Sequence, residues 1–183
     1  MNVIASPGQL RASLIRWSLL CVPGVVLLGF LSGQMGGNAN SAWFEGLTKP
    51  GLFPPPATFG IVWTILYAML GFALALVCAA WGARGRTVAI VAFLVHLAIN
   101  LTWTPLFFGA HEIEAALYLL VAIVLTGIGV AVLFWRVRKL AGWLMIPYLT
   151  WVCFATVLNY QFLELNPGAS GEVPSGAAQR IEF

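Results

Sequence analysis

Charged residues are scarce in this chain, since nine Lys and Arg and six Asp and Glu make up 8% of 183 residues. A soluble globular domain typically carries about 25% charged residues, so this composition excludes that class. The basic residues are also spread too thinly to form a nucleic-acid footprint. We expect no nucleic-acid partner.

Residues for metal binding and catalysis are equally sparse. Cys21, Cys78 and Cys153 each stand in an apolar run, without the CxxC or Cys/His spacing of a metal site. The sequence has no paired intramembrane carboxylates, no Ser/His/Asp set and no glycine-rich phosphate loop. We therefore expect a binding protein rather than an enzyme, with no metal and no obligatory cofactor.

Apolar sequence is abundant, since 61% of the residues are hydrophobic and the mean hydropathy is +0.93. Five charge-free windows can each hold the roughly 20 residues that cross a bilayer as a helix, and none alternates like a β-barrel strand. We predict an all-α, multi-pass membrane protein, a bundle of five transmembrane helices within residues 1–166. The predicted helices are about 13–35, 57–81, 87–108, 112–135 and 141–164, followed by a disordered tail at 167–183.

The first connection is long and rich in helix breakers, with Gly36 and Gly37 at its start and prolines at 50 and 54–56. Residues 41–47 between them could form one interfacial turn. The other connections are short. If the helices cross alternately, seven of the nine basic residues lie on one side: Arg11, Arg16, Arg84, Arg86, Arg136, Arg138 and Lys139. The positive-inside rule then places the N-terminus on the cytoplasmic side.

Aromatic and polar residues gather in the half of the bundle opposite these basic residues, where the first connection could cover them. They are Trp63, Tyr67, Asn100, Trp103, Tyr118, Asn159 and Tyr160. This convergence predicts an aromatic cavity with a lid. The alternatives are that the aromatic residues anchor the helices at the membrane interface and that the asparagines form interhelical hydrogen bonds. His96 could ligate a haem, but a lone intramembrane His is more often hydrogen-bonded. A Gly29, Gly33, Gly37 ladder allows close helix contact.

Three stretches together carry a family resemblance. They are residues 43–50 (WFEGLTKP) running on to 59–67 (FGIVWTILY), residues 100–109 (NLTWTPLFFG), and residues 147–151 (PYLTW) with 155–160 (ATVLNY). Over about residues 15–166 the chain closely resembles the tryptophan-rich sensory protein or translocator protein family (TspO/MBR).

The resemblance implies a five-helix bundle, usually a homodimer, that binds porphyrins such as protoporphyrin IX, sterols and other hydrophobic ligands beneath the first loop. By motif position, the implied ligand-binding residues are Trp43, Trp63, Asn100, Trp103, Trp151, Ala155, Leu158 and Asn159. Leu52 and Ala57 stand where many members carry Trp, with Phe53 and Phe59 as possible replacements. The sterol-recognition pattern also fails here, because no Lys or Arg follows Tyr160 within helix five.

The leading hypothesis is a membrane receptor or carrier for tetrapyrroles, acting in their sensing or transport. A flat ligand would stack on Trp63, Trp103 and Trp151, with Lys49 meeting a propionate at the rim. The alternative is an enzymatic one, photo-oxidative porphyrin breakdown with Trp151 or Trp103 as redox partner. Transport of a small solute is a third reading, for which the sequence offers no coupling-ion site.

Overall fold

The computed structural model of this protein describes residues 6–35 and 41–171, and these are helical with short connections and no strand. The helices are α1 (Pro7–Met35), α2 (Ala42–Gly46), α3 (Pro56–Cys78), α4 (Arg86–Leu101), the π-helical turn η1 (Pro105–Gly109), α5 (Ile113–Val137) and α6 (Lys139–Leu165). Five segments of the described chain are long and apolar enough to cross a membrane: α1, α3, α4 with η1, α5 and α6. The predicted five-helix transmembrane bundle is confirmed.

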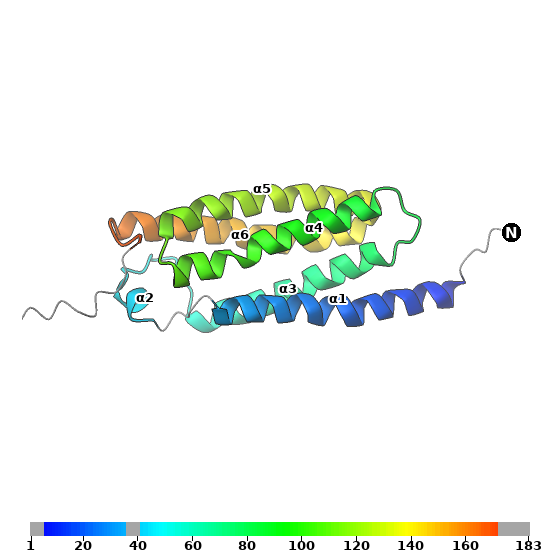
Figure 1. The fold of residues 1–183 in the computed structure, drawn as a ribbon, viewed down its shortest axis with the longest axis horizontal. Helices are drawn as coiled ribbons and strands as arrows, with labels where there is room; N and C mark the ends of the chain where they lie inside the picture. Colours follow the sequence, from blue (N-terminus) through cyan, green and yellow to red (C-terminus); the bar gives the residue numbers. More distant parts are fainter. Residues whose placement is uncertain (1–5, 36–40, 172–183) are drawn as a thin grey trace, which may run out of the picture.

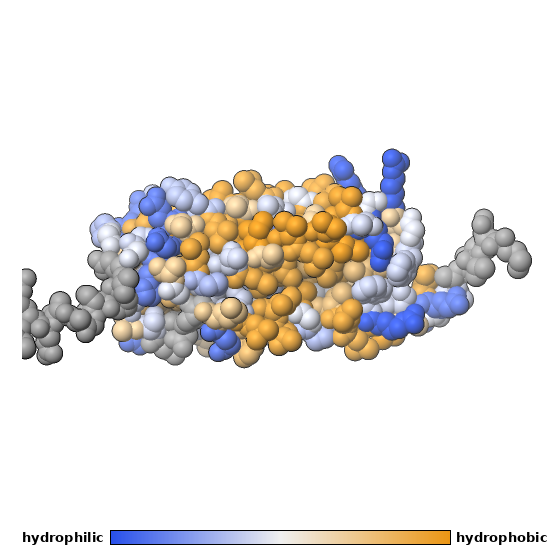
Figure 2. All heavy atoms as spheres, in the orientation of Figure 1, coloured by the Kyte–Doolittle hydropathy of each residue, from blue (hydrophilic) through white to orange (hydrophobic). Residues whose placement is uncertain are grey.

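The long helices run up and down along one common axis, with α1 and α3 side by side and α4, α5 and α6 packed against them (Figure 1). The most extensive contacts join α5 to α6 and α1 to α3. Figure 2 shows an apolar band across the middle of the visible face and hydrophilic residues toward both ends. This distribution matches a bilayer with water on either side.

The observed helix ends differ slightly from the predicted ones. The first helix begins at Pro7 rather than at about 13, so it extends beyond the length that hydrocarbon requires. The predicted interfacial turn at 41–47 is confirmed as α2, in which the Ser41 hydroxyl caps the helix by accepting from the Phe44 N–H. Gly36 and Gly37 lie outside the described residues.

The third transmembrane segment is interrupted, although the sequence predicted one helix from 87 to 108. Pro105 has no N–H to donate to the carbonyl of Leu101, four residues earlier, so α4 ends there and the chain continues as η1. The Ser32 hydroxyl of α1 donates to this freed Leu101 carbonyl, at 2.6 Å. Because a bare carbonyl is costly in hydrocarbon, this bond ties α1 to the break in α4.

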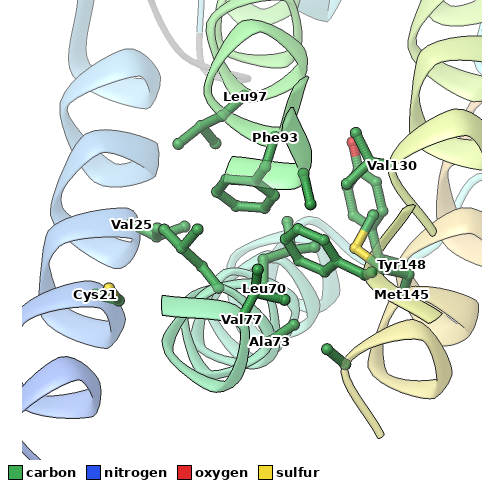
Figure 3. Close-up of a cluster of buried hydrophobic side chains, with 14 of the residues drawn as sticks. Cys21, Val25, Leu70, Ala73, Val77, Phe93, Leu97, Val130, Met145 and Tyr148 are labelled. Carbon is green, nitrogen blue, oxygen red and sulfur yellow. The ribbon is translucent and has the colours of Figure 1, made fainter. Parts of the chain in front are cut away.

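Apolar side chains fill the half of the bundle that is nearer to the basic residues. Val25 of α1, Leu70 of α3, Phe93 of α4, Val130 of α5 and Met145 of α6 meet there (Figure 3). All five are buried. A second buried cluster lies at the opposite end, where α2 covers η1, α5 and α6; its members are Trp43, Phe44, Leu47, Phe107, Ile113, Ala116, Leu158 and Phe162. The space between the two clusters is where the site lies.

Residues 167–171, at the start of the predicted tail, form hydrogen bonds with the rest of the chain. The Gly171 N–H donates to the His111 carbonyl at 3.0 Å, and the Ser170 hydroxyl accepts from the Glu114 N–H at 3.3 Å. These bonds hold residues 167–171 against the connection between η1 and α5. Residues 172–183 of the predicted tail lie outside the described part of the chain.

Candidate functional site

A cavity of about 760 Å3 opens between the two clusters, in the half of the bundle that α2 covers. Its walls come from α1, α3, residues 103–108 and α6, with single contributions from α2 (Phe44), α4 (Asn100) and α5 (Leu120). This volume lies in the range of pockets that hold drug-sized ligands. The structure therefore has the covered cavity that the sequence predicts, at the predicted depth.

Ten aromatic side chains line the cavity: Phe30, Phe44, Phe53, Phe59, Trp63, Tyr67, Trp103, Phe107, Phe108 and Phe162. The rings support one another in pairs. Trp63 stacks on Tyr67 with centroids 5.3 Å apart, and Trp103 stacks on Phe107 at 5.1 Å. Such ring pairs are worth about 0.5–1.5 kcal/mol beyond their area burial, so the walls have a fixed shape before any ligand arrives.

Residues 41–49, which include α2, form a lid over this cavity. The lid is hydrogen-bonded to the end of α6 and to the residues after it. The Asn166 amide accepts from the Thr48 N–H at 2.7 Å and donates to the Thr48 carbonyl at 3.1 Å. The Trp43 indole donates to the Ala169 carbonyl at 3.3 Å and stacks on His111 with centroids 4.4 Å apart. These contacts hold α2 so that Phe44 faces the cavity.

Lys49 lies within the lid instead of at the cavity rim. Its ammonium donates to the carbonyls of Phe44, Glu45 and Leu47 and sits over the Phe44 ring, 4.5 Å from the centroid. An ammonium has only three donors, and all three are used here. Partial burial lowers the pKa of Lys49, while the Glu45 charge opposes that shift. Lys49 thus caps the end of α2, and its contact with a ligand propionate stays a prediction.

One end of the cavity is polar. Tyr67 and Asn100 both line it, and the Tyr67 hydroxyl donates to the Asn100 side-chain carbonyl at 2.9 Å. Asn100 in turn donates to the Tyr148 hydroxyl, which also bonds His96 at 2.8 Å. His96 is therefore a buried, hydrogen-bonded residue, and the described residues contain no group of side chains that could hold a metal ion.

Six of the eight implied ligand-binding residues line the cavity: Trp63, Asn100, Trp103, Ala155, Leu158 and Asn159. Trp43 does not; its buried ring stacks on His111 and meets Phe107 edge-on. Trp151 does not either, since it packs behind Phe59, with ring centroids 5.9 Å apart. Asn159 also forms an interhelical hydrogen bond, the alternative role predicted for the asparagines, by donating to the Ile113 carbonyl at 2.8 Å.

The wall that α1 contributes was missed by the sequence reasoning. It comprises Pro23, Val26, Leu27, Gly29, Phe30, Gly33 and Gln34. Gly29 was assigned to helix contact, and it does allow one, because any β-carbon there would collide with the Tyr67 ring. The middle of α1, residues 19–31, is apolar on every face and so carries no periodic signal for a cavity wall. Phe53 and Phe59, the proposed replacements for two missing tryptophans, could be named from their positions.

The comparisons with known proteins agree with the sequence motifs. Residues 21–165 match the TspO/MBR family. The chain is 37% identical to the tryptophan-rich protein TspO of Chlorobaculum tepidum over 149 residues, covering 81% of this chain and 94% of that one. It is 37% identical to protein CrtK of Rhodobacter capsulatus, covering 69% and 80%, and 35% identical to the translocator protein of Homo sapiens, covering 70% and 78%. A five-helix membrane bundle with these matches along most of its length belongs to the TspO/MBR family.

Proposed function

We propose that this protein is a membrane receptor or carrier that binds a porphyrin or a related flat hydrophobic ligand in the cavity beneath α2. The observation that carries the proposal is the aromatic lining of a cavity of about 760 Å3. Burial of a few hundred Å2 of ring surface at about 25 cal/mol per Å2 contributes several kcal/mol. After the entropy cost of binding, this supports a dissociation constant of about 1 μM.

The route into the cavity supports a ligand that arrives through the bilayer. Leu27 and Phe30 of α1 line the cavity and are also 56% and 60% exposed. The cavity thus extends to the outer face of the bundle between α1 and α3. A ligand dissolved in lipid could enter there while the lid stays closed, which suits a role in tetrapyrrole sensing or transport.

The direct test is a titration of the purified protein with protoporphyrin IX in the dark, followed by tryptophan quenching. We expect saturable micromolar binding in the wild type and a loss of about tenfold in Trp103→Phe, because the smaller ring leaves part of the wall unfilled. Trp143→Phe is the matched control, since Trp143 is 57% exposed and outside the cavity lining. Nonsaturable quenching in the wild type would remove the porphyrin assignment.

A second candidate function is the photo-oxidative breakdown of a bound porphyrin, with oxygen as the oxidant. The position of Trp103 favours this function, because its oxidisable indole lies on the cavity wall. Trp151 lies behind the Phe59 ring, which lines the cavity. Illumination of the complex followed by mass spectrometry tests the idea. Product that disappears in Trp103→Phe or Trp151→Phe at saturating ligand would support it, and porphyrin recovered intact from the wild type would exclude it.

We also propose that the protein is a homodimer and accepts sterol-like lipids, as the family resemblance implies. Cross-linking in native membranes tests the dimer, and competition between protoporphyrin IX and a sterol tests the shared cavity. A monomer in membranes, or a sterol that never displaces porphyrin, would contradict the respective part.

A further inference from the structure

A shallow groove of about 310 Å3 lies at the basic end of the bundle, away from the cavity beneath α2. It runs between the first part of α1 and the connection from α3 to α4, which lie at the same end of the molecule (Figure 1). The residues that line it are Ser13, Arg16, Trp17, Leu20 and Trp81. Among the described residues, the groove and the cavity share no lining side chain, so the groove is a separate feature.

The floor of the groove is one face of α1. Its four residues, Ser13, Arg16, Trp17 and Leu20, follow the spacing i, i+3, i+4 and i+7 that puts side chains on one side of a helix. Over about 10 Å along the helix, the floor passes from a hydroxyl and a guanidinium to an indole and then to an aliphatic side chain. A phospholipid presents the same order of chemistry, from phosphate through glycerol to acyl chain.

The opposite wall is the Trp81 ring, which is held in place although it is 67% exposed. Arg86 donates two hydrogen bonds to the Cys78 carbonyl, at 3.0 and 2.8 Å, and its guanidinium lies 4.2 Å from the centroid of the Trp81 ring. The Trp17 ring is tilted against Trp81 with centroids 6.5 Å apart. The two indoles therefore form the sides of the groove before any lipid binds.

The groove lies at the depth where headgroups meet hydrocarbon. Counting about 20 residues back from Met35, the end of α1, places the hydrocarbon boundary near Arg16. Arg16 is exposed, and side chains lean toward the start of their helix, so its guanidinium reaches the headgroup layer. Leu20 is one turn deeper, beside the acyl chains.

The charge at this end of the bundle has no protein counterion. The first acidic residue of the sequence is Glu45, and none lies between it and Glu112. Within the described part of the chain, the Arg16 guanidinium makes no hydrogen bond or ion pair. A free guanidinium offers paired N–H donors that fit a phosphate. The groove thus combines a positive charge without a partner with an apolar floor.

We propose that this groove binds one anionic phospholipid from the leaflet at the basic end. Its phosphate accepts hydrogen bonds from the Arg16 guanidinium and the Ser13 hydroxyl, and one acyl chain lies along Leu20 and the two indoles. Because α1 forms one side and the connection from α3 to α4 the other, the bound lipid holds the start of α1 against that connection. The site is independent of the ligand cavity.

Native mass spectrometry of the full chain in a neutral detergent tests the site, with dioleoylphosphatidylglycerol and dioleoylphosphatidylcholine as the probes. The two lipids have the same phosphate and acyl chains, but the choline ammonium cancels the phosphate charge. We expect the first phosphatidylglycerol to bind roughly fivefold to tenfold more tightly than phosphatidylcholine. Saturating phosphatidylglycerol should also raise the unfolding temperature more than phosphatidylcholine does.

Arg16→Gln should weaken the first phosphatidylglycerol about fivefold and phosphatidylcholine by less than about twofold. Arg11→Gln is the matched control, because it removes the same charge from the same helix outside the groove lining. Trp81→Ala should weaken both lipids, since it removes an apolar wall. Its control is Trp143→Ala, because Trp143 is 57% exposed and also lies outside the groove.

Three results would overturn the proposal. Equal affinities of the wild type for the two lipids would remove the anionic specificity. Equal losses in Arg11→Gln and Arg16→Gln would show diffuse attraction to the basic end instead of a site. Displacement of phosphatidylglycerol by inorganic phosphate would show that the groove holds a bare anion. Each of these results leaves the ligand cavity beneath α2 untouched.

Discussion

At the residue scale, Tyr148 is a hydrogen-bond partner that two buried polar side chains, Asn100 and His96, share. Its ring is fully buried against Trp63 and His96, and its single hydroxyl serves both Asn100 and His96. In hydrocarbon no water can replace a missing partner. The Tyr148 hydroxyl therefore bonds the side chains of two residues of α4, Asn100 and His96.

Tyr148→Phe should lower the free energy of unfolding by about 1–3 kcal/mol, because it leaves two buried polar atoms without a partner while keeping the ring. Thermal unfolding of the purified protein in detergent measures the change. Tyr160→Phe is the matched control, since Tyr160 is 49% exposed and bonds only Glu164 on its own helix. Equal stability of the two variants would show that the Tyr148 hydroxyl stabilises nothing.

At the element scale, the contact between α1 and α3 depends on Gly71. A β-carbon at Gly71 would lie 2.6 Å from the Val22 α-carbon and 2.7 Å from the Cys21 carbonyl oxygen, both backbone atoms. Backbone cannot move aside like a side chain, so only glycine lets the two helices approach this closely.

Gly71→Ala should force α1 away from α3, cost about 1–3 kcal/mol of stability and weaken ligand binding. Gly129→Ala is the control, because a β-carbon on that α5 residue meets nothing within 4 Å and alanine favours the helix. Thermal unfolding measures the change in stability, and titration with protoporphyrin IX measures the change in ligand binding. A Gly71→Ala protein as stable as Gly129→Ala would mean that the helices are not this close in the membrane.

The second element-scale feature is the attachment of the lid by Asn166. Asn166→Ala removes its bonds to Thr48 and Phe162, so we expect amide hydrogen exchange in residues 42–47 and the ligand dissociation rate to rise by about tenfold. Thr48→Ala should leave both unchanged, since Asn166 bonds only the Thr48 main chain. Unchanged exchange in Asn166→Ala would show that Trp43 and its neighbours suffice to hold the lid.

At the scale of the whole molecule, charge is divided between the two ends of the bundle. Figure 1 shows the start of α1 and the α3–α4 and α5–α6 connections at one end of the bundle, and these segments carry Arg11, Arg84, Arg86, Arg136 and Arg138. The opposite end, with α2, the start of α5 and the end of α6, carries Glu45, Glu112, Glu114 and Glu164. Arg86 is fixed at the basic end by two bonds to the Cys78 carbonyl and by its place over the Trp81 ring, 4.2 Å from the centroid. The basic end is the one that the positive-inside rule retains in the cytoplasm.

We therefore expect the N-terminus inside and the lid outside. Green fluorescent protein fused to the N-terminus should fluoresce, and alkaline phosphatase should be active after Asn166 but inactive after Arg138. The opposite pattern of phosphatase activity would place the cavity on the cytoplasmic side of the membrane.

Much of this architecture was predictable because a bilayer imposes simple rules on a chain. Charge-free windows and the requirement for internal backbone bonds determine five helices, and the breakers before Pro56 determine a long first connection. The depth of Trp63, Asn100 and Trp103 along their helices placed them in one half of the bundle. Their common depth followed from helix geometry alone.

Tertiary structure alone decided which faces of the helices meet. The sequence could not show that Trp43 and Trp151 pack against Phe107 and Phe59, because apolar helices lack the periodicity that separates a lipid-facing from a cavity-facing side. Nor could it show that Ser32 serves the Leu101 carbonyl, since those residues are far apart in the chain. The sequence by itself determined the membrane bundle and its family, whereas side-chain packing decided the cavity walls and the hydrogen bonds that join Tyr67, Asn100, Tyr148 and His96.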